Sequence, residues 1–232
     1  MPAQPGSVGA IIAAAGQSRR FGEGDKLFAP LAGRPLILHT LIAFEVCRAV
    51  DRVVLVLAAE SLERGRRLVE AAGFDKVAAV CPGGPRRRDS VRLGLEALGE
   101  CRWVVVHDGA RPLVTAALIE AGLAAAAETG AAIAAVPVTD TLKEATEDGL
   151  ITRTLDRHNL WAAQTPQVFA YELLREAHRL ADAVGDATDD AALVEALGRR
   201  VKVFPGSPRN LKVTTAADLA LAQALLAESG EG

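Results

Sequence analysis

The sequence predicts an α/β fold in which helices cover both faces of a mostly parallel sheet. Short apolar runs without charged residues alternate with segments whose apolar residues recur at helical spacing, and such runs are typical of strands buried on both faces. The chain has 232 residues, of which 50% are hydrophobic and 24% are charged, enough for one large core. We therefore expect residues 1–232 to form a single domain.

The charge balance and the N-terminus indicate a cytoplasmic protein with a small ligand. A formal net charge of −3 gives no reason to expect binding to nucleic acid or to an anionic membrane. The N-terminus lacks the pattern of a signal peptide, and no apolar run reaches the roughly 18 residues of a membrane-spanning helix. Cys47, Cys81 and Cys101 include no CxxC pair, so free thiols are expected rather than a zinc site or a disulfide framework.

Capping and breaking residues delimit the elements of the first half. Pro35 suits the first turn of a helix, Ser61 can cap the next helix, and Gly73 can end it. Asp89 or Ser90 can cap the helix that follows them. The expected elements are a strand from residue 8, a helix over 35–49, a strand over 52–58, a helix over 61–72, a strand over 76–80, a helix after 90 and a strand over 102–107.

The second half continues this alternation. Thr115 and Thr215 are suitable caps for two further helices, and residues 161–169 return the chain to the body of the domain without an assigned element. The remaining expected elements are a helix over 115–129, a strand over 131–137, helices over 171–181 and 191–197, a strand over 201–204, a short strand or turn over 210–214, and a helix from 215 to about 228.

Residues 138–159 interrupt the pattern. Alternating apolar and polar residues on both sides of Asp148-Gly149 predict a β-hairpin that projects from the main sheet. A lone two-stranded arm is marginally stable in water, so we expect it to pack against a second copy of the chain.

The first strand opens into a loop with the properties of a phosphate site. Residues 13–16, Ala-Ala-Ala-Gly, carry almost no side chain, so the backbone can lie against a ligand and offer N–H groups to an anion. Arg19, Arg20 and Lys26 bring three cations to this loop, which would sit at the carboxyl edge of a parallel sheet. The Walker and dinucleotide-binding patterns do not match. A surface loop with solvent-facing arginines is the alternative.

A second loop has a similar character. Gly83 and Gly84 precede three adjacent arginines, Arg86 to Arg88, and the N-terminus of a helix follows. Together these features form an edge that favours anions. Three adjacent arginines are also typical of a solvated turn, so both interpretations stay open at this point.

Asp108 is the candidate metal ligand. It ends an uninterrupted apolar strand, where an acidic residue needs a reason, and a carboxylate there can hold Mg²⁺ beside a nucleotide phosphate. The alternative is that Asp108 caps the turn before the helix at Thr115. We interpret the neighbouring His107 as a structural histidine.

Eight motifs are spaced over nearly the whole chain. They are residues 14–21 with Lys26, Gly83-Gly84 with 87–91, 106–112, 140–143, 156–157, Trp161 with 164–167, 188–190 and 210–214. In type and order they resemble the family of 2-C-methyl-D-erythritol 4-phosphate cytidylyltransferases of the non-mevalonate isoprenoid pathway. One such motif alone would be weak evidence, whereas eight in the family's order are specific.

The resemblance implies a reaction in which the phosphate of methylerythritol phosphate attacks the α-phosphorus of CTP and expels pyrophosphate, with Mg²⁺ as the divalent cation. It also implies a Rossmann-like sheet of the nucleotidyltransferase type and a homodimer in which the arm reaches the neighbour's site. The acceptor phosphate is already an anionic nucleophile, so cations and alignment must carry the catalysis.

The resemblance also assigns roles to single residues. Arg20 and Lys26 match residues that stabilise the transition state at the α-phosphate, and Asp108 matches the position that binds Mg²⁺ and the ribose region. Arg157 and Lys212 resemble the pair that positions the attacking phosphate, and these four cations are the expected catalytic residues. The expected substrate-binding residues are Ala14, Ala15, Gly16, Gly84, Arg87, Ser90, Asp108, Arg111, Thr141 and Thr165.

The chain departs from the family pattern at several positions. Ala13 and Asp25 stand where many relatives have proline, and Pro85 replaces an acidic residue that can help to read the base. A ribitol-5-phosphate cytidylyltransferase, which shares the nucleotide motifs, is the alternative enzyme. A nucleotide-binding relative without catalytic activity is the alternative of another class.

Overall fold

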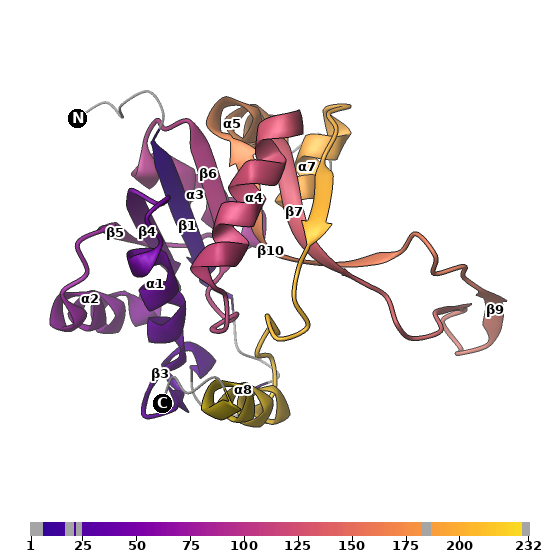
Figure 1. Ribbon diagram of the computed structural model, residues 1–232, viewed down its shortest axis with the longest axis horizontal. Coiled ribbons are helices and arrows are strands. Elements are labelled where there is room, and N and C mark those ends of the chain that lie inside the picture. Colours follow the sequence, from indigo (N-terminus) through magenta and orange to yellow (C-terminus); the bar gives the residue numbers. More distant parts are fainter. Residues whose placement is uncertain (1–6, 17–20, 22–24, 182–186, 229–232) are drawn as a thin grey trace.

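Seven strands form one sheet at the centre of the molecule (Figure 1). The computed structural model describes residues 7–16, 21, 25–181 and 187–228. The strands lie side by side in the order β11-β7-β10-β6-β1-β4-β5. Their bounds are Val8–Ala14 (β1), Arg52–Leu57 (β4), Val77–Pro82 (β5), Trp103–Asp108 (β6), Ala131–Pro137 (β7), Trp161–Ala170 (β10) and Lys202–Pro205 (β11).

Strand β10 is the antiparallel member of this sheet. It runs opposite to both of its neighbours, β6 and β7, whereas the other pairs of adjacent strands are parallel. The expected mostly parallel α/β sheet is therefore confirmed. The sequence did not predict β10 itself, because Pro166 and the buried polar side chains of Gln164, Thr165 and Gln167 mask the strand pattern.

Helices pack on both faces of the sheet and enclose two hydrophobic cores. Ala10 and Ile12 of β1 belong to one core and Ile11 to the other, because successive side chains of a strand point to opposite faces. Residues of α1, α2, α4 and α8 pack in the first core, and residues of α3, α5 and α7 pack in the second. The helix bounds are Leu36–Val46 (α1), Leu62–Ala72 (α2), Arg87–Leu98 (α3), Ala116–Thr129 (α4), Tyr171–Arg179 (α5), Asp190–Ala196 (α7) and Ala216–Glu228 (α8).

The helix ends confirm some of the expected caps and correct one. Thr115 caps α4 and Thr215 caps α8 through their hydroxyl oxygens, and Gly73 ends α2 in the left-handed conformation. Ser61 does not cap α2, because its hydroxyl donates instead to the Asp25 carboxylate at 2.8 Å. Within the described ranges, no helix has the length and apolar character needed to cross a membrane.

The expected cap of α3 is also wrong. The helix begins at Arg87, before Asp89 and Ser90, and Arg86 stands at its N-cap position. The Asp89 carboxylate accepts a hydrogen bond from the Arg86 backbone N–H at 3.2 Å and another from its side chain at 2.8 Å. This pairing holds Arg86 at the start of the helix.

The arm is confirmed as an antiparallel hairpin. Strands β8 (Lys143–Ala145) and β9 (Ile151–Thr154) pair around a turn in which Gly149 adopts a φ of +85°. Every residue of both strands is exposed, and the arm extends away from the sheet (Figure 1). A second hairpin, of β2 (Pro30–Leu31) and β3 (Arg34–Pro35), was not expected from the sequence.

The three cysteines are free thiols, as expected. Cys47 is buried, and Cys81 and Cys101 are partly buried. Burial raises the pKa of each thiol, which keeps all three protonated at neutral pH.

Candidate active site

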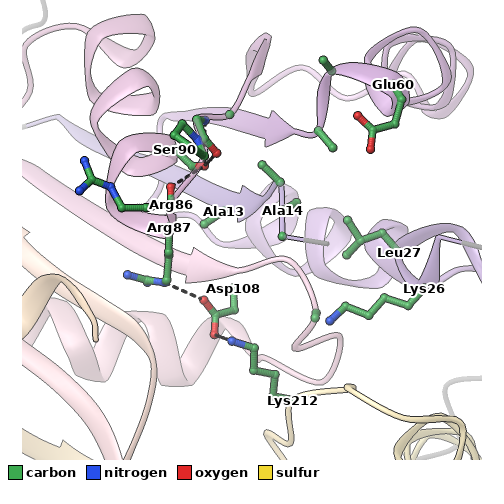
Figure 2. A pocket seen from close by; sticks show the side chains of 18 of the residues that line it. Ala13, Ala14, Lys26, Leu27, Glu60, Arg86, Arg87, Ser90, Asp108 and Lys212 are labelled. Carbon is green, nitrogen blue, oxygen red and sulfur yellow. Dashed lines mark hydrogen bonds and ion pairs between the residues drawn. The ribbon is translucent and has the colours of Figure 1, made fainter. Parts of the chain in front are cut away.

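A pocket of about 620 Å³ lies where β1, β4, β5 and β6 end (Figure 2). In α/β sheets, ligands bind outside the carboxyl ends of the strands. Four cationic side chains line the pocket against two carboxylates, those of Glu60 and Asp108. The pocket brings together these expected site residues: Ala14, Ala15, Gly16, Lys26, Gly84, Arg87, Ser90, Asp108 and Lys212.

One wall of the pocket consists of small residues in close contact. A Cβ atom on Gly83 would lie 2.2 Å from the Cβ of Ala15 and 2.7 Å from the Oγ of Ser90, so glycine is required there. The Ser90 hydroxyl oxygen accepts a hydrogen bond from the Gly84 N–H at 3.1 Å. The backbones of the two loops are thus close enough for a ligand to reach their N–H and C=O groups directly.

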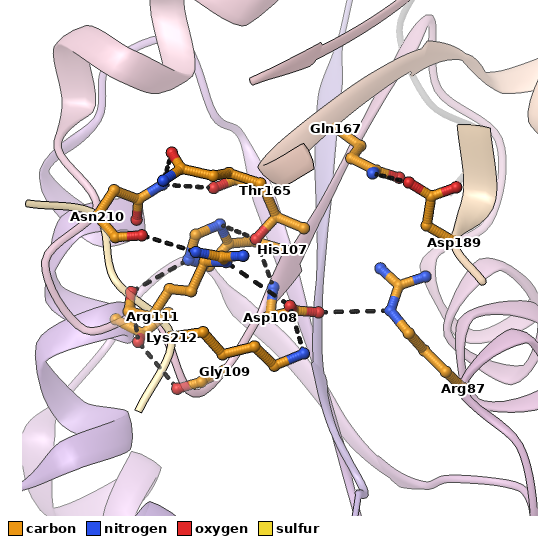
Figure 3. A network of polar contacts seen from close by, with 12 residues as sticks. Arg87, His107, Asp108, Gly109, Arg111, Thr165, Gln167, Asp189, Asn210 and Lys212 are labelled. Carbon is orange, nitrogen blue, oxygen red and sulfur yellow. Dashed lines mark hydrogen bonds and ion pairs between the residues drawn. The ribbon is translucent and has the colours of Figure 1, made fainter. Parts of the chain in front are cut away.

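Asp108 is the electrostatic centre of the pocket (Figure 3). Its carboxylate oxygens lie 2.8 Å from Lys212 Nζ, 3.4 Å from Arg87 Nε and 3.7 Å from Arg111 Nε. Burial acts to raise the pKa of the Asp108 carboxyl, but Arg87 and Lys212 outweigh it and hold this pKa well below its usual range. Asp108 is therefore ionised at neutral pH.

Lys212 reaches Asp108 because the chain around it is anchored to the end of β6. Val213 N–H donates to the Ala110 carbonyl at 2.8 Å, and Arg111 donates to the Asn210 carbonyl at 2.7 Å. Residues 210–214, expected as a short strand or turn, contain no strand, and the turn lies just before them at residues 208–209, where Asn210 N–H closes it by donating to the Ser207 carbonyl. Tertiary hydrogen bonds, rather than a regular element, thus place Lys212.

Lys26 is positioned by the residue before it. It opens a short 3₁₀ helix, η1 (Lys26–Phe28), whose other side chains, Leu27 and Phe28, are buried. Asp25 caps η1 by accepting a hydrogen bond from Leu27 N–H at 3.0 Å, and it also accepts the Ser61 hydroxyl bond. Asp25 therefore fixes the position of the Lys26 loop.

Arg111 and Thr165 lie beneath the pocket rather than in its lining. Both are buried, and the Thr165 hydroxyl oxygen accepts a hydrogen bond from the Asp108 N–H at 3.0 Å. Arg111 forms an ion pair with the Asp108 carboxylate (Figure 3). The two residues therefore support Asp108 from below.

Two further expected site residues, Thr141 and Arg157, are not in this pocket. Thr141 and Arg157 are exposed residues of the arm, and Arg157 donates to the Thr139 carbonyl. Neither residue is part of the pocket lining. Arg20, expected to act with Lys26, lies outside the described residues.

His107 has the structural role that its position suggested, and it is fully buried. Its Nε2 lies 3.2 Å from the Arg111 carbonyl, and its Nδ1 lies 3.0 Å from the Thr165 hydroxyl. A carbonyl only accepts, so Nε2 carries the proton and Nδ1 accepts from Thr165. Burial lowers the pKa of His107 to about 4, so the ring is neutral at pH 7.

Sequence reasoning missed two buried partners of this site. Asp190 accepts a hydrogen bond from Arg87 Nη1 at 2.6 Å, and His178 Nε2 lies 2.9 Å from the same carboxylate. The motif at residues 188–190 was a signal, but nothing local in it indicates that Asp190 faces Arg87, which lies 103 positions earlier.

The donor set fits a magnesium ion that arrives with a phosphate ligand. Among the described residues, no group of three or more histidine, cysteine or acidic side chains could hold a metal. Mg²⁺ needs only one or two carboxylates when phosphate oxygens and water complete its shell. Asp108 can supply one carboxylate oxygen, in competition with the cations that now face it.

The sheet and the cationic pocket define a nucleotidyltransferase of the α/β class. The family model for 2-C-methyl-D-erythritol 4-phosphate cytidylyltransferase matches residues 8–228. A protein of that name from Dehalococcoides mccartyi (strain CBDB1) is 48% identical over 219 residues, covering 94% of this chain and 96% of its own. Another, from Pelotomaculum thermopropionicum, is 49% identical over 223 residues and covers 94% of each chain.

Solved structures agree with this match. The 4-diphosphocytidyl-2C-methyl-D-erythritol synthase of Anaerococcus prevotii superposes with a TM-score of 0.84 at 29% identity, covering 95% of this chain and 98% of its own. The 2-C-methyl-D-erythritol 4-phosphate cytidylyltransferase of Thermus thermophilus gives a TM-score of 0.77 at 36% identity, covering 94% and 98%. The chain belongs to the 2-C-methyl-D-erythritol 4-phosphate cytidylyltransferase family.

Because His107 is buried in its neutral form, we predict that it makes stability sensitive to mild acid. The unfolded chain takes up this proton near the ordinary pKa of about 6.5, and the folded chain does so only near pH 4. As pH falls through this window, the free energy of unfolding should lose about 3 kcal/mol from this residue. Urea unfolding at several pH values should show a shallower loss in His107→Gln than in the wild type.

The matched control for this prediction is His158→Gln, which removes a histidine from the exposed arm. Equal pH slopes for the wild type and His107→Gln would contradict the prediction.

Proposed function

We propose that this chain transfers the cytidylyl group of CTP to 2-C-methyl-D-erythritol 4-phosphate in the non-mevalonate route to isoprenoids. An oxygen of the acceptor phosphate bonds to the α-phosphorus, and the bond to the β-phosphate breaks to release pyrophosphate. The observation that carries the proposal is the convergence of Lys26, Arg87 and Lys212 with Asp108 in one pocket of a member of this family.

The reaction requires the protein to align the two substrates and to supply positive charge. The acceptor phosphate is anionic at neutral pH, so it needs no activating base, and the barrier lies in bringing two anions together. Preorganised cations reduce that barrier most when they face the charge that develops in the transition state. We assign this role to Lys26 and Arg20, and the positioning of the attacking phosphate to Lys212 and Arg157.

We assign the small-residue wall to the nucleotide. Ala14, Ala15, Gly16, Gly84 and Ser90 present backbone groups without bulky side chains, which suits close contact with a flat base. Arg87 stands at the same edge of the pocket and is assigned to the triphosphate.

The sugar-phosphate side is assigned to Arg111, Thr141 and Thr165. Arg111 and Thr165 hold Asp108 from below in this structure, and Thr141 would come from an arm. Asp108 would hold Mg²⁺ together with phosphate oxygens, and the ion would neutralise charge on the triphosphate.

A pyrophosphate-release assay with purified protein, CTP and Mg²⁺ tests the proposal. We expect release with 2-C-methyl-D-erythritol 4-phosphate, little release with ribitol 5-phosphate, and loss of release when EDTA removes the metal. Faster turnover with ribitol 5-phosphate would assign the chain to the alternative acceptor. No release with any polyol phosphate would overturn the enzymatic assignment.

We predict that Lys26→Ala lowers turnover by at least about tenfold, because it removes a cation that faces the α-phosphate. The fold should persist, since η1 is held by buried Leu27 and Phe28 and by Asp25. The matched control is Lys202→Ala, which removes a lysine of the edge strand β11 that forms an ion pair with Glu128. A rate for Lys26→Ala equal to that of the control would count against the proposed role.

We further propose that the arm makes a homodimer in which Thr141 and Arg157 serve the neighbouring subunit's pocket. Leu150 and Ile151 on the arm are 66% and 64% exposed, a large apolar surface for a two-stranded ribbon that is marginal by itself. Neither Thr141 nor Arg157 lines the pocket of its own subunit. Packing against a second copy would cover the apolar surface and bring both residues to a site.

Mixing two inactive variants tests this arrangement. Lys26→Ala and Arg157→Ala should each be nearly inactive, but a mixed dimer contains one site with both native residues. After subunit exchange, about a quarter of wild-type activity should return if pairing is random. Absence of recovery in a sample that light scattering shows to be dimeric would rule out a shared site, and a monomeric wild type would rule out the dimer.

A further inference from the structure

Arg87 is held between two carboxylates that come from different parts of the chain. Its Nε lies 3.4 Å from Asp108 at the pocket, and its Nη1 lies 2.6 Å from Asp190 behind it. Its Nη2 is buried and has no hydrogen-bond partner among the described residues. The guanidinium therefore makes a short ion pair with Asp190 behind the pocket and a longer one with Asp108 at the pocket.

Asp190 is a buried carboxylate whose partners compensate its charge. It is fully buried and is the first residue of α7. Burying a carboxylate is costly unless charged or hydrogen-bonding partners compensate. Arg87 and His178 provide that compensation, and although burial opposes it, Arg87 lowers the pKa of Asp190.

The start of α7 is fixed independently of Asp190. The preceding residue, Asp189, caps the helix by accepting a hydrogen bond from Ala192 N–H at 3.0 Å. Its other oxygen accepts from Gln167 Nε2 at 2.7 Å, which ties α7 to β10 (Figure 3). Because Asp189 caps α7, the Asp190 carboxylate is not needed as a cap and is free to pair with Arg87.

Resting on the proposed function, we infer that Asp190 is a positioning residue for nucleotide binding and acts through Arg87. Asp108 is the weaker partner of Arg87, and a bound nucleotide with its metal would compete for that carboxylate. Arg87 would then stay at the pocket edge because Asp190 retains it. Its Nε–H, which faces Asp108 in this structure, would then become available to the triphosphate without the entropy loss of ordering a free arginine.

The test is a double-mutant cycle on CTP binding and turnover. Asp190→Asn keeps the shape and one accepting oxygen but removes the charge. We expect it to raise the KM and the calorimetric Kd for CTP by about tenfold, with a smaller change in kcat and an unchanged KM for the acceptor. In an Arg87→Gln background the same substitution should change CTP affinity by less than about twofold, because its target is gone.

Asp189→Asn is the matched control. Asparagine also caps helices with its single side-chain oxygen, and its amide N–H can donate to Gln167 Oε1, which is buried without a partner here, once the Gln167 amide turns over. Asp189→Asn should therefore leave CTP affinity unchanged. If Asp190→Asn fails to fold, His178→Asn provides the second variant, since it loosens Asp190 while leaving its carboxylate. A rise in the Kd for CTP that disappears in the Arg87→Gln background is again expected.

Two outcomes would overturn the inference. One is an additive effect of Asp190 and Arg87 substitutions on CTP affinity, and the other is a lower kcat with unchanged affinity, which indicates a purely structural role. The proposed function fails separately, when the wild type binds CTP but releases no pyrophosphate with the acceptor. In that case the calorimetric cycle still decides the role of Asp190.

Discussion

The ion-pair cluster around Asp108 is the interaction on which this site depends. A carboxylate at the buried end of β6 gathers Arg87 from α3, Lys212 from the chain before α8, and Arg111 from the loop that follows the strand. A lone charge at that depth would be strongly destabilising, so the cluster couples the fold to the charge pattern of the pocket. The cations meet there because one anion compensates their mutual repulsion.

The same cluster explains why a pocket of this charge is compatible with a stable fold. Cations assembled to receive phosphates repel one another, and Asp108 offsets that repulsion. Buried residues behind Asp108 and Arg87 also hold these two side chains in place. The Thr165 hydroxyl accepts a hydrogen bond from the Asp108 backbone N–H and donates one to the buried His107 ring. Asp190 in turn holds Arg87. Polar residues that would be costly in a core are thus paired with one another and positioned for chemistry.

Local patterns predicted much of this structure. The apolar run before Ala14 and the caps Thr115 and Thr215 correspond to observed elements, because strand burial and capping are decided by neighbours in the chain. The antiparallel strand β10 escaped prediction because its buried side chains include glutamines and a threonine satisfied by distant partners. The cap of α3 was misplaced because Arg86, not a typical capping residue, takes that position through Asp89.

The sequence by itself determined the type of fold, the positions of the two glycine-containing loops and the acid at the end of a strand, since these depend on composition and spacing. Only the tertiary structure decided which charges meet. Asp190 lies 103 positions from its partner Arg87, and Lys212 lies 104 positions from its partner Asp108. Neither residue has a local signal for its partner. Side chains that distant become neighbours only when the sheet order is set, because strand pairing and helix packing place their backbones together.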